Sequence, residues 1–243
     1  MWWTNLFKDM SSTSFFNFSF LPAYTGYFLQ GMAYTLLLAV VSVALAVIPA
    51  LLLALMRLSK RKVIQCISGA YIAVFRSTPL LVQLSIIYFG LFTAISIPRI
   101  TILGFVDLSR FIPGVVALAL NSSAYVAEIF RAGILAVDKG QTEAARSLGL
   151  SSWQSMRLVV LPQAIKNVLP ALANEVVTMV KESSICSMLG MAELMFVSKT
   201  VPTGTYITLA PYTIAALIYF CINYPASKAI EAIERRMRRG DKQ

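Results

Sequence analysis

The chain has 243 residues, of which 58% are hydrophobic and only 13% are charged, about half the charged share of ordinary soluble domains. It contains no histidine, which excludes histidine-based metal sites, Ser-His-Asp triads and histidine proton relays, and it lacks the G-x-x-x-x-G-K pattern of a P-loop. Cys66, Cys186 and Cys221 are scattered through apolar stretches without the spacing of metal ligands, as expected of small buried hydrophobic residues. This composition predicts an all-α integral membrane protein that is not an enzyme, with no metal and no cofactor of its own.

Residues 1–25 form an aromatic, Ser-rich segment at the start of the chain. Its rings come from Trp2, Trp3, Phe15, Phe16, Phe18 and Phe20, among others. It has neither the basic region nor the small-residue cleavage site of a signal peptide. Because aromatic side chains prefer the headgroup layer of a membrane, we expect an interfacial or extracytoplasmic lead-in. A disordered tail is the alternative.

About five apolar spans follow within one transmembrane domain, residues 26–228. No charged residue occurs between Asp9 and Arg57 or between Lys199 and Lys228, and about 18 apolar residues are enough to cross a bilayer core of roughly 30 Å. We predict spans over about 26–56, 63–97, 111–137, 164 into the 180s, and 206–226. Pro79 interrupts the second span, which is long enough to be bent or strongly tilted.

Basic residues gather at three places, and these predict the orientation. They lie after the first span, between the third and fourth spans, and in a C-terminal tail, residues 229–243. Because Lys-rich and Arg-rich loops stay in the cytoplasm, we expect the N-terminus outside and the C-terminus inside. This bias, together with anionic lipid of the inner leaflet, accounts for the formal charge of +10, so that no nucleic acid is needed to explain it.

The segment 138–165 is too polar to enter lipid and lies on the cytoplasmic side in this topology. We expect a short helix over 141–148 ended by Gly149 as a left-handed cap, and a second helix begun by a Ser151–Gln154 capping box. Pro162 marks the return into the membrane. A connector without further function is the alternative, but connectors are usually a few residues long, so this length favours a docking surface.

The same segment follows the pattern E-A-A-x3-G-x9-I-x-L-P, with Val159 in place of Ile. It thereby resembles the EAA loop of ABC importer permease subunits. The positions that match, with Arg146 beside them, are the expected contacts of an ATPase: Glu143, Ala144, Ala145, Arg146, Gly149, Leu161 and Pro162. In this role the alanines permit close approach, Glu143 supplies a charge and Gly149 allows the turn.

Three further motifs narrow the resemblance to polar amino acid permeases, the histidine, glutamine, arginine and cystine type. Residues 75–83 resemble R-G-T-P-L-L-V-Q with Ser77 for Gly, and residues 124–134 resemble A-Y-x-A-E-I-x-R-G-G-I with Ala132 for Gly. Residues 181–184 and 192–194 are similar to K-D-T-S and A-E-L. The resemblance covers the chain from about Gly26 to the C-terminus.

The resemblance implies a type I importer permease fold with a cytoplasmic coupling helix, in the cytoplasmic membrane of a bacterium. Two permeases, identical or paired with a sister subunit, would form the pathway. Two separate ATPase subunits would bind ATP and Mg, and an extracellular binding protein would deliver a polar amino acid or a close analogue.

Several polar and charged residues fall at membrane depth, where a charge is costly and usually functional. Asn121, Tyr125 and Glu128 share one helix face, and Asn174, Thr178 and Lys181 repeat that spacing, so we expect two stripes on a shared interior. The candidates for the substrate pathway are Arg76, Thr78, Gln83, Asn121, Tyr125, Glu128, Thr178, Lys181, Glu182 and Ser183.

Two interpretations of these charges remain open. In one, Glu128–Arg131 and Lys181–Glu182 with Arg76 are structural pairs; in the other, some of them bind the zwitterionic ends of an amino acid. Arg76, beside the Pro79 break, is the best single candidate, since interrupted helices expose backbone groups at transport sites.

Other functions are also open to this composition. An ATP-independent secondary transporter or channel is one alternative, although an odd number of spans without an inverted repeat counts against it. An ABC permease for another small solute, such as an opine or a sulfur-containing amino acid, is the other.

Overall fold

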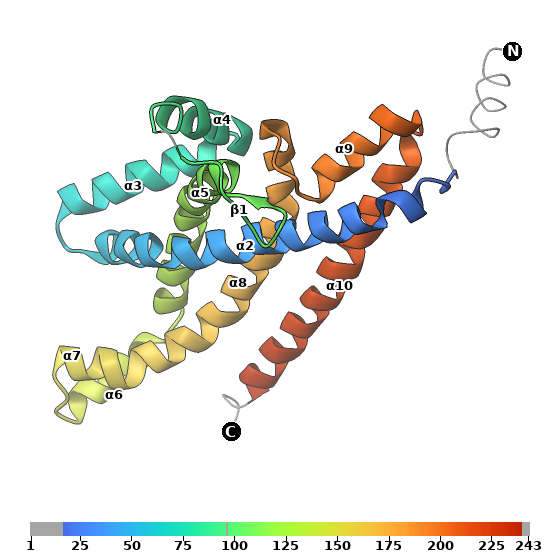
Figure 1. Cartoon of the computed structure of the whole chain (residues 1–243). Helices are drawn as coiled ribbons and strands as arrows, with labels where there is room; N and C mark the ends of the chain where they lie inside the picture. The colour runs from blue at the N-terminus through green and yellow to red at the C-terminus, as the bar shows by residue number, and fades with distance from the viewer. Residues whose placement is uncertain (1–16, 96, 240–243) are drawn as a thin grey trace, which may run out of the picture.

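The structure is a computed structural model that describes residues 17–95 and 97–239. Helices dominate, and a single two-stranded hairpin is the only sheet among the described residues (Figure 1). Trp2, Trp3, Phe15 and Phe16 of the expected lead-in lie outside this part of the chain. Phe20, which is described, is buried, and the first helix begins at the next residue.

The first helix, α2 (Leu21–Leu58), packs against α5 (Leu108–Leu135), and the two helices cross in Figure 1. Ala39, Ala46 and Ala50 are buried on the face of α2 that meets the rest of the molecule. Small residues on that face let two helix backbones approach closely, which is how helices associate in lipid. The opposite face carries exposed Ile48 and Leu52, the arrangement expected where a helix borders lipid.

The second predicted span is broken rather than continuous. Helix α3 (Lys62–Ser77) ends before Thr78 and Pro79, and α4 (Leu80–Ser85) restarts the chain with a π-helical extension, η1 (Ile86–Leu91). The axes on the two sides of the break differ by 106°. Pro79 lacks an amide hydrogen and disfavours helical geometry in the residue before it, which places the break at Thr78.

A hairpin connects this unit to α5. Strands β1 (Thr101–Ile102) and β2 (Val106–Asp107) pair antiparallel, and the turn between them uses Leu103 and Gly104 at positive φ. Asp107 then caps α5 by accepting a hydrogen bond of 3.0 Å from the amide of Ser109. The hairpin was not anticipated from the sequence.

Helix α5 leads into the polar segment and then into the second half of the chain. The elements of that half are α6 (Lys139–Ser147), α7 (Ser152–Ser155), η2 (Met156–Val160), α8 (Leu161–Glu182), η3 (Ser183–Leu189), α9 (Leu194–Thr205) and α10 (Leu209–Arg239). Helix α9 was missed in the sequence, and α10 continues from the fifth predicted span into the basic tail without a break.

Within the described residues, three helices are long and apolar enough to cross a membrane: α2, α5 and α10. Two bent pairs raise the number to five if each counts as one span. Three of the five predicted stretches therefore fall in these single helices, and the other two fall in the bent pairs.

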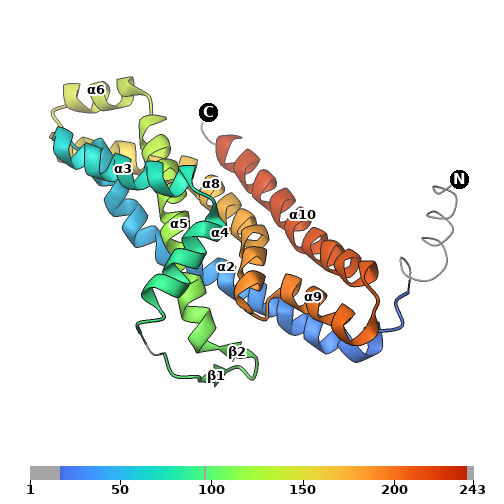
Figure 2. The same cartoon turned by 90° about the horizontal axis from the view of Figure 1, so that it is seen from above.

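Helix α5 lies at the centre of the fold, against α2, α3 and α8, while α10 packs on α8 and α9. A buried cluster that includes Tyr34, Leu38, Leu118 and Met179 joins α2, α5 and α8. Helix α6 lies at one end of the molecule (Figure 2), and α7 lies beside it at that end in Figure 1. This leaves a polar tip at one end and a set of intramembrane charges close to the α5 axis.

Candidate functional site

The polar segment folds as a helical hairpin between α5 and α8. Asp138 caps α6 by accepting a hydrogen bond of 2.7 Å from the amide of Gly140. The helix spans Lys139–Ser147, within two residues of the predicted bounds at each end. Glu143 and Ala144 are exposed, whereas Ala145 is buried beneath them. One face of α6 is therefore free and the other is fixed to the hairpin.

The turn of this hairpin has the predicted left-handed glycine and the predicted capping box. Gly149 has a φ of 87°, and its amide donates to the carbonyl of Arg146 at 3.0 Å. Ser151 and Gln154 form the capping box, with hydrogen bonds of 2.8 and 3.2 Å between their side chains and each other's amides. Arg146 donates to the hydroxyl of Ser152 at 2.6 Å and so bridges the two arms. The hairpin is internally bonded and rigid.

Large apolar side chains are exposed on this polar tip. Leu148 is 85% exposed, Trp153 70% and Leu158 61%. Side chains of this size on a protruding, well-capped hairpin are typical of a contact with another protein.

The second arm of the hairpin leads into α8, which begins next to Pro162, the residue predicted to mark the return into the membrane. The π-helical turn η2 joins α7 to α8, and the amide of Leu161 donates to the carbonyl of Met156, five residues back. Pro162 occupies the first turn of α8, where its missing amide hydrogen costs little. The second arm and α8 therefore form one continuous helical path from Ser152 to Glu182.

The break between α3 and α4 is braced by buried amides. The side-chain amide of Gln83 donates to the carbonyls of Phe75 at 2.8 Å and Thr78 at 2.9 Å, and to the Thr78 hydroxyl at 2.7 Å. Its oxygen accepts a hydrogen bond of 2.8 Å from Asn121 of α5. Gln83 is only 6% exposed and Asn121 3%. These three sequence candidates, Thr78 included, bond to one another and secure the break.

A cavity of about 460 Å³ opens beside this brace, between the end of α3, α5 and α8. Its polar walls are Arg76 and Tyr125, Glu128 of α5, and Asn167 and Glu175 of α8. The Arg76 guanidinium lies over the Tyr125 ring, 5.4 Å from its centroid, in a cation–π contact. The cavity thus places one cationic group and two carboxyl groups around a common space.

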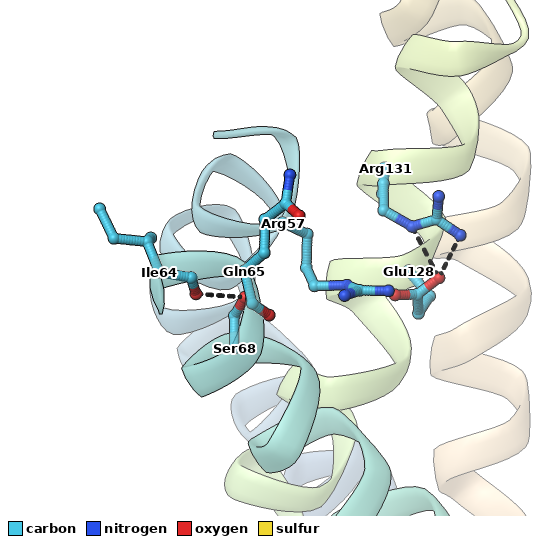
Figure 3. A network of polar contacts seen from close by, with 6 residues as sticks. All are labelled: Arg57, Ile64, Gln65, Ser68, Glu128 and Arg131. Carbon is cyan, nitrogen blue, oxygen red and sulfur yellow. Dashed lines mark hydrogen bonds and ion pairs between the residues drawn. The ribbon is translucent and has the colours of Figure 1, made fainter. Parts of the chain in front are cut away.

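Glu128 is held from two sides, as Figure 3 shows. Arg131, one turn further along α5, donates from Nε at 2.9 Å and from Nη2 at 2.7 Å to Glu128 Oε2. Arg57, from the end of α2, brings its Nε to 3.8 Å from Oε1. The predicted Glu128–Arg131 pair is confirmed, and Arg57 is an addition that sequence spacing could not supply.

Comparison with known proteins identifies the family of this chain. The family model described as "Binding-protein-dependent transport system inner membrane component" matches residues 43–239. The chain belongs to this family. It is therefore a multi-pass protein of the cytoplasmic membrane and the permease subunit of an ABC importer, with ATP hydrolysis left to a separate subunit. The prediction of a non-catalytic permease is confirmed.

Individual relatives agree along nearly the full length of the permease. It is 41% identical over 215 residues to the arginine transport system permease protein ArtQ of Bacillus subtilis, a match that covers 88% of this chain and 94% of the relative. A crystal structure of an amino acid ABC transporter with histidines superposes with a TM-score of 0.82 at 47% identity, over 90% and 98% of the two chains. The MetNI methionine transporter, in an inward-facing form, is 18% identical with a TM-score of 0.66 over 87% and 98%, which shows a shared fold.

Two polar cavity residues, Asn167 and Glu175, were missed by sequence reasoning, and Glu175 is the charged one. Its carboxylate accepts a hydrogen bond of 2.7 Å from the Ser122 hydroxyl of α5. It lies within the fourth predicted span, so the rule that selected Lys181 and Glu182, a charge at membrane depth, would also have found it.

The second predicted stripe does not line this cavity of the permease. Asn174 faces a different cavity beside α10, Lys181 is exposed, and Thr178 lies outside both. The face of α8 that meets the cavity carries Asn167, Ala171 and Glu175 instead. Adjacent residues on a helix point about 100° apart, which separates Glu175 from Asn174.

The remaining candidates lie toward the far end of α8, away from this cavity. Ser183 is buried, and its hydroxyl bonds to the carbonyl of Val180 at 2.9 Å. Across the described part of the permease, no ion pair joins Glu182 to Lys181 or to Arg76. Of the two interpretations left open, the structural pairing of these three residues is therefore not found, and Arg76 lies over Tyr125 instead.

Proposed function

We propose that the permease carries a polar amino acid through the cavity between α3, α5 and α8. An amino acid is a zwitterion, and the cavity offers Arg76 for its carboxylate and Glu128 and Glu175 for its ammonium group. A guanidinium is well suited to bind a carboxylate through paired hydrogen bonds. This pairing of opposite charges around one space is the observation that carries the proposal.

The size and position of the cavity support the same substrate. Its volume of about 460 Å³ falls in the range of roughly 300–1,000 Å³ common for small-molecule sites. The break at Pro79 lies next to Arg76, where the chain leaves helical geometry. Relatives named for arginine and for histidines agree with an amino acid substrate.

Transport would be driven through the α6–η2 hairpin, residues 138–165. Its exposed apolar side chains and the free face with Glu143 and Ala144 would fill a groove on an ATPase subunit. Because the hairpin is continuous with α8, a displacement at the tip would move the wall that carries Glu175.

The proposed orientation of the chain decides on which side of the membrane each partner would bind. The hairpin and the basic ends of α2 and α10 would lie in the cytoplasm, with the N-terminus outside. Two ATPase subunits holding ATP and Mg would dock on two permeases, identical or of two kinds. An extracellular binding protein would deliver the amino acid.

Uptake by the reconstituted transporter tests the substrate assignment. We expect Arg76→Ala and Glu175→Gln to reduce ATP-dependent uptake of a polar amino acid more than tenfold while the complex still assembles, and Glu128→Ala to act in the same direction. Asn174→Ala is the control, since Asn174 lines the adjoining hollow beside α10, which shares Asn167 and Ala171 with this cavity, but does not line the cavity itself. Normal uptake in both the Arg76 and Glu175 variants would overturn the proposal.

The same assay separates the alternative functions. Uptake that persists without any ATPase would favour an ATP-independent carrier or channel. Competition by an opine, but by no amino acid, would assign the permease to another solute.

A further inference from the structure

A basic crevice lies on the other side of Glu128, between the end of α2 and the outer face of α3. Two adjoining hollows of about 450 and 500 Å³ share Arg57, Gly69 and Ala73 as lining residues. The first also reaches Arg76, and the second opens toward Lys62 and Gln65. Gly69 and Ala73 of α3 line the crevice together with the cationic side chains of Arg57, Arg76 and Lys62.

The cationic charge of this crevice is only partly balanced. Glu128 is the one carboxyl group that lines it, and that group already accepts two hydrogen bonds from Arg131. The Nε of Arg57 is buried and makes an ion pair of 3.8 Å with Glu128 Oε1, which is too long for a hydrogen bond, and it has no hydrogen-bond acceptor among the residues that the structure describes. A buried guanidinium nitrogen without an acceptor is costly, so an anionic ligand there would be stabilising.

Gly69 keeps the crevice open under Arg57. A Cβ at this position would stand 3.1 Å from Arg57 Nη1. The guanidinium therefore lies close to the α3 backbone at Gly69, where a larger residue would crowd it.

The outer face of α3 beside the crevice is apolar. Val63, Ile67 and Val74 are 72%, 60% and 58% exposed. Their spacing of four and seven residues places them on one helix face. A ligand that fits both features has an anionic head and a long apolar tail.

We propose that this crevice is a binding site for an anionic phospholipid. The lipid phosphate would accept hydrogen bonds from Arg57 and form an ion pair with Lys62. The acyl chains of the lipid would lie over Val63, Ile67 and Val74 of α3. Lys60 and Arg61, in the turn between α2 and α3, add to the attraction for an anionic leaflet. The lipid would hold the end of α2 against α3, next to the transport cavity, with which the crevice shares Arg76 and Glu128.

Native mass spectrometry of the full-length permease in detergent tests this site. Phosphatidylglycerol is added over a range of concentrations, and phosphatidylcholine with the same acyl chains serves as the neutral lipid. We expect one phosphatidylglycerol to bind tightly per chain. Arg57→Gln should raise its apparent Kd about tenfold and Arg57→Lys less, since lysine keeps the charge but not the fork of donors.

Two further variants guard against indirect effects. Lys62→Gln changes an exposed side chain, cannot disturb the core, and should raise the Kd about fivefold. Arg235→Gln removes an exposed charge from α10, far from the crevice, and should leave the Kd unchanged.

The outcomes that would overturn the proposal are distinct. Equal affinity for phosphatidylcholine would show that only the apolar acyl chains bind. Equal increases of the Kd in Arg57→Gln and Arg235→Gln would show that the lipid responds to the net charge of the permease rather than to this crevice. Displacement of the lipid by inorganic phosphate at a few times the lipid concentration would assign the crevice to a small anion. Unchanged binding in both Arg57→Gln and Lys62→Gln would remove the site altogether.

Discussion

Asn121 of α5 donates a hydrogen bond of 2.8 Å to Gln83 of α4, and both amides are buried. Through this bond the central helix holds the start of α4, and Gln83 in turn holds the carbonyls of Phe75 and Thr78 that the break at Pro79 leaves without helical partners. A broken helix inside a membrane protein needs such partners, because lipid offers none.

Asn121→Ala is therefore expected to lower the stability of the permease. It leaves the Gln83 oxygen buried without its donor, which costs about 1–3 kcal/mol. Thermal unfolding in detergent measures the loss. Gln30→Ala, an exposed amide on α2, should change the melting temperature little. An equal shift of the melting temperature in the two variants would mean that the Asn121–Gln83 hydrogen bond does not stabilise the permease.

Gly133→Ala should separate α5 from α8. A Cβ at Gly133 would collide with the side chain of Val168 and stand 3.4 Å from the carbonyl of Ala164. Overpacking of this kind costs about 1–3 kcal/mol. Adding Val168→Ala should restore part of the loss, and the size of the rescue in a double-mutant cycle measures the contact. Gly26→Ala, where a Cβ has open space, is the control; purely additive effects at Gly133 and Val168 would refute the close packing.

Gly149→Ala should distort the hairpin turn while the transmembrane helices stay intact. The φ of 87° is unfavourable for a residue with a Cβ, by roughly 1–2 kcal/mol. Gly149→Asn should be milder, since asparagine tolerates this region better. We expect less ATPase to co-purify with the alanine variant at an unchanged melting temperature. Full recovery of coupled ATP hydrolysis with the alanine variant would contradict this.

Glu143→Lys should leave the permease in the membrane but weaken its hold on the ATPase. The side chain is exposed on the free face of α6, so a reversed charge there acts on a partner rather than on folding. Gln141→Lys places a lysine about 200° around the helix, with a charge change of one unit instead of two, and should be tolerated better. Pull-down of the ATPase and substrate-stimulated ATP hydrolysis measure both. Equal coupling in the two variants would remove Glu143 from the interface.

The local features of this protein were predictable because they depend on neighbouring residues. Long uncharged stretches predicted the apolar helices, and Pro79 predicted where the second would break. Gly149 and the Ser151–Gln154 pair predicted the hairpin turn, and the structure has both. Capping and turn geometry are set within a few residues, so the sequence alone was sufficient there.

The cavity was decided by the tertiary structure. Periodicity showed that Asn121, Tyr125 and Glu128 share a face of α5, but not that Asn121 would meet Gln83 while Tyr125 meets Arg76. Arg57 lies 71 residues before Glu128 and reaches it only because α2 packs along α5.

The sequence shows that Glu175 is a charge at membrane depth, but only the packing shows which way its side chain points. Helices in lipid are apolar around most of their surface, so the pattern of α8 does not mark which face meets a neighbour. Glu175 and Asn174 are adjacent in sequence, and only the rotation of α8 against α5 directs Glu175 into the cavity and Asn174 toward α10. Sequence determined which helices form and where they turn; packing decided which side chains share a space.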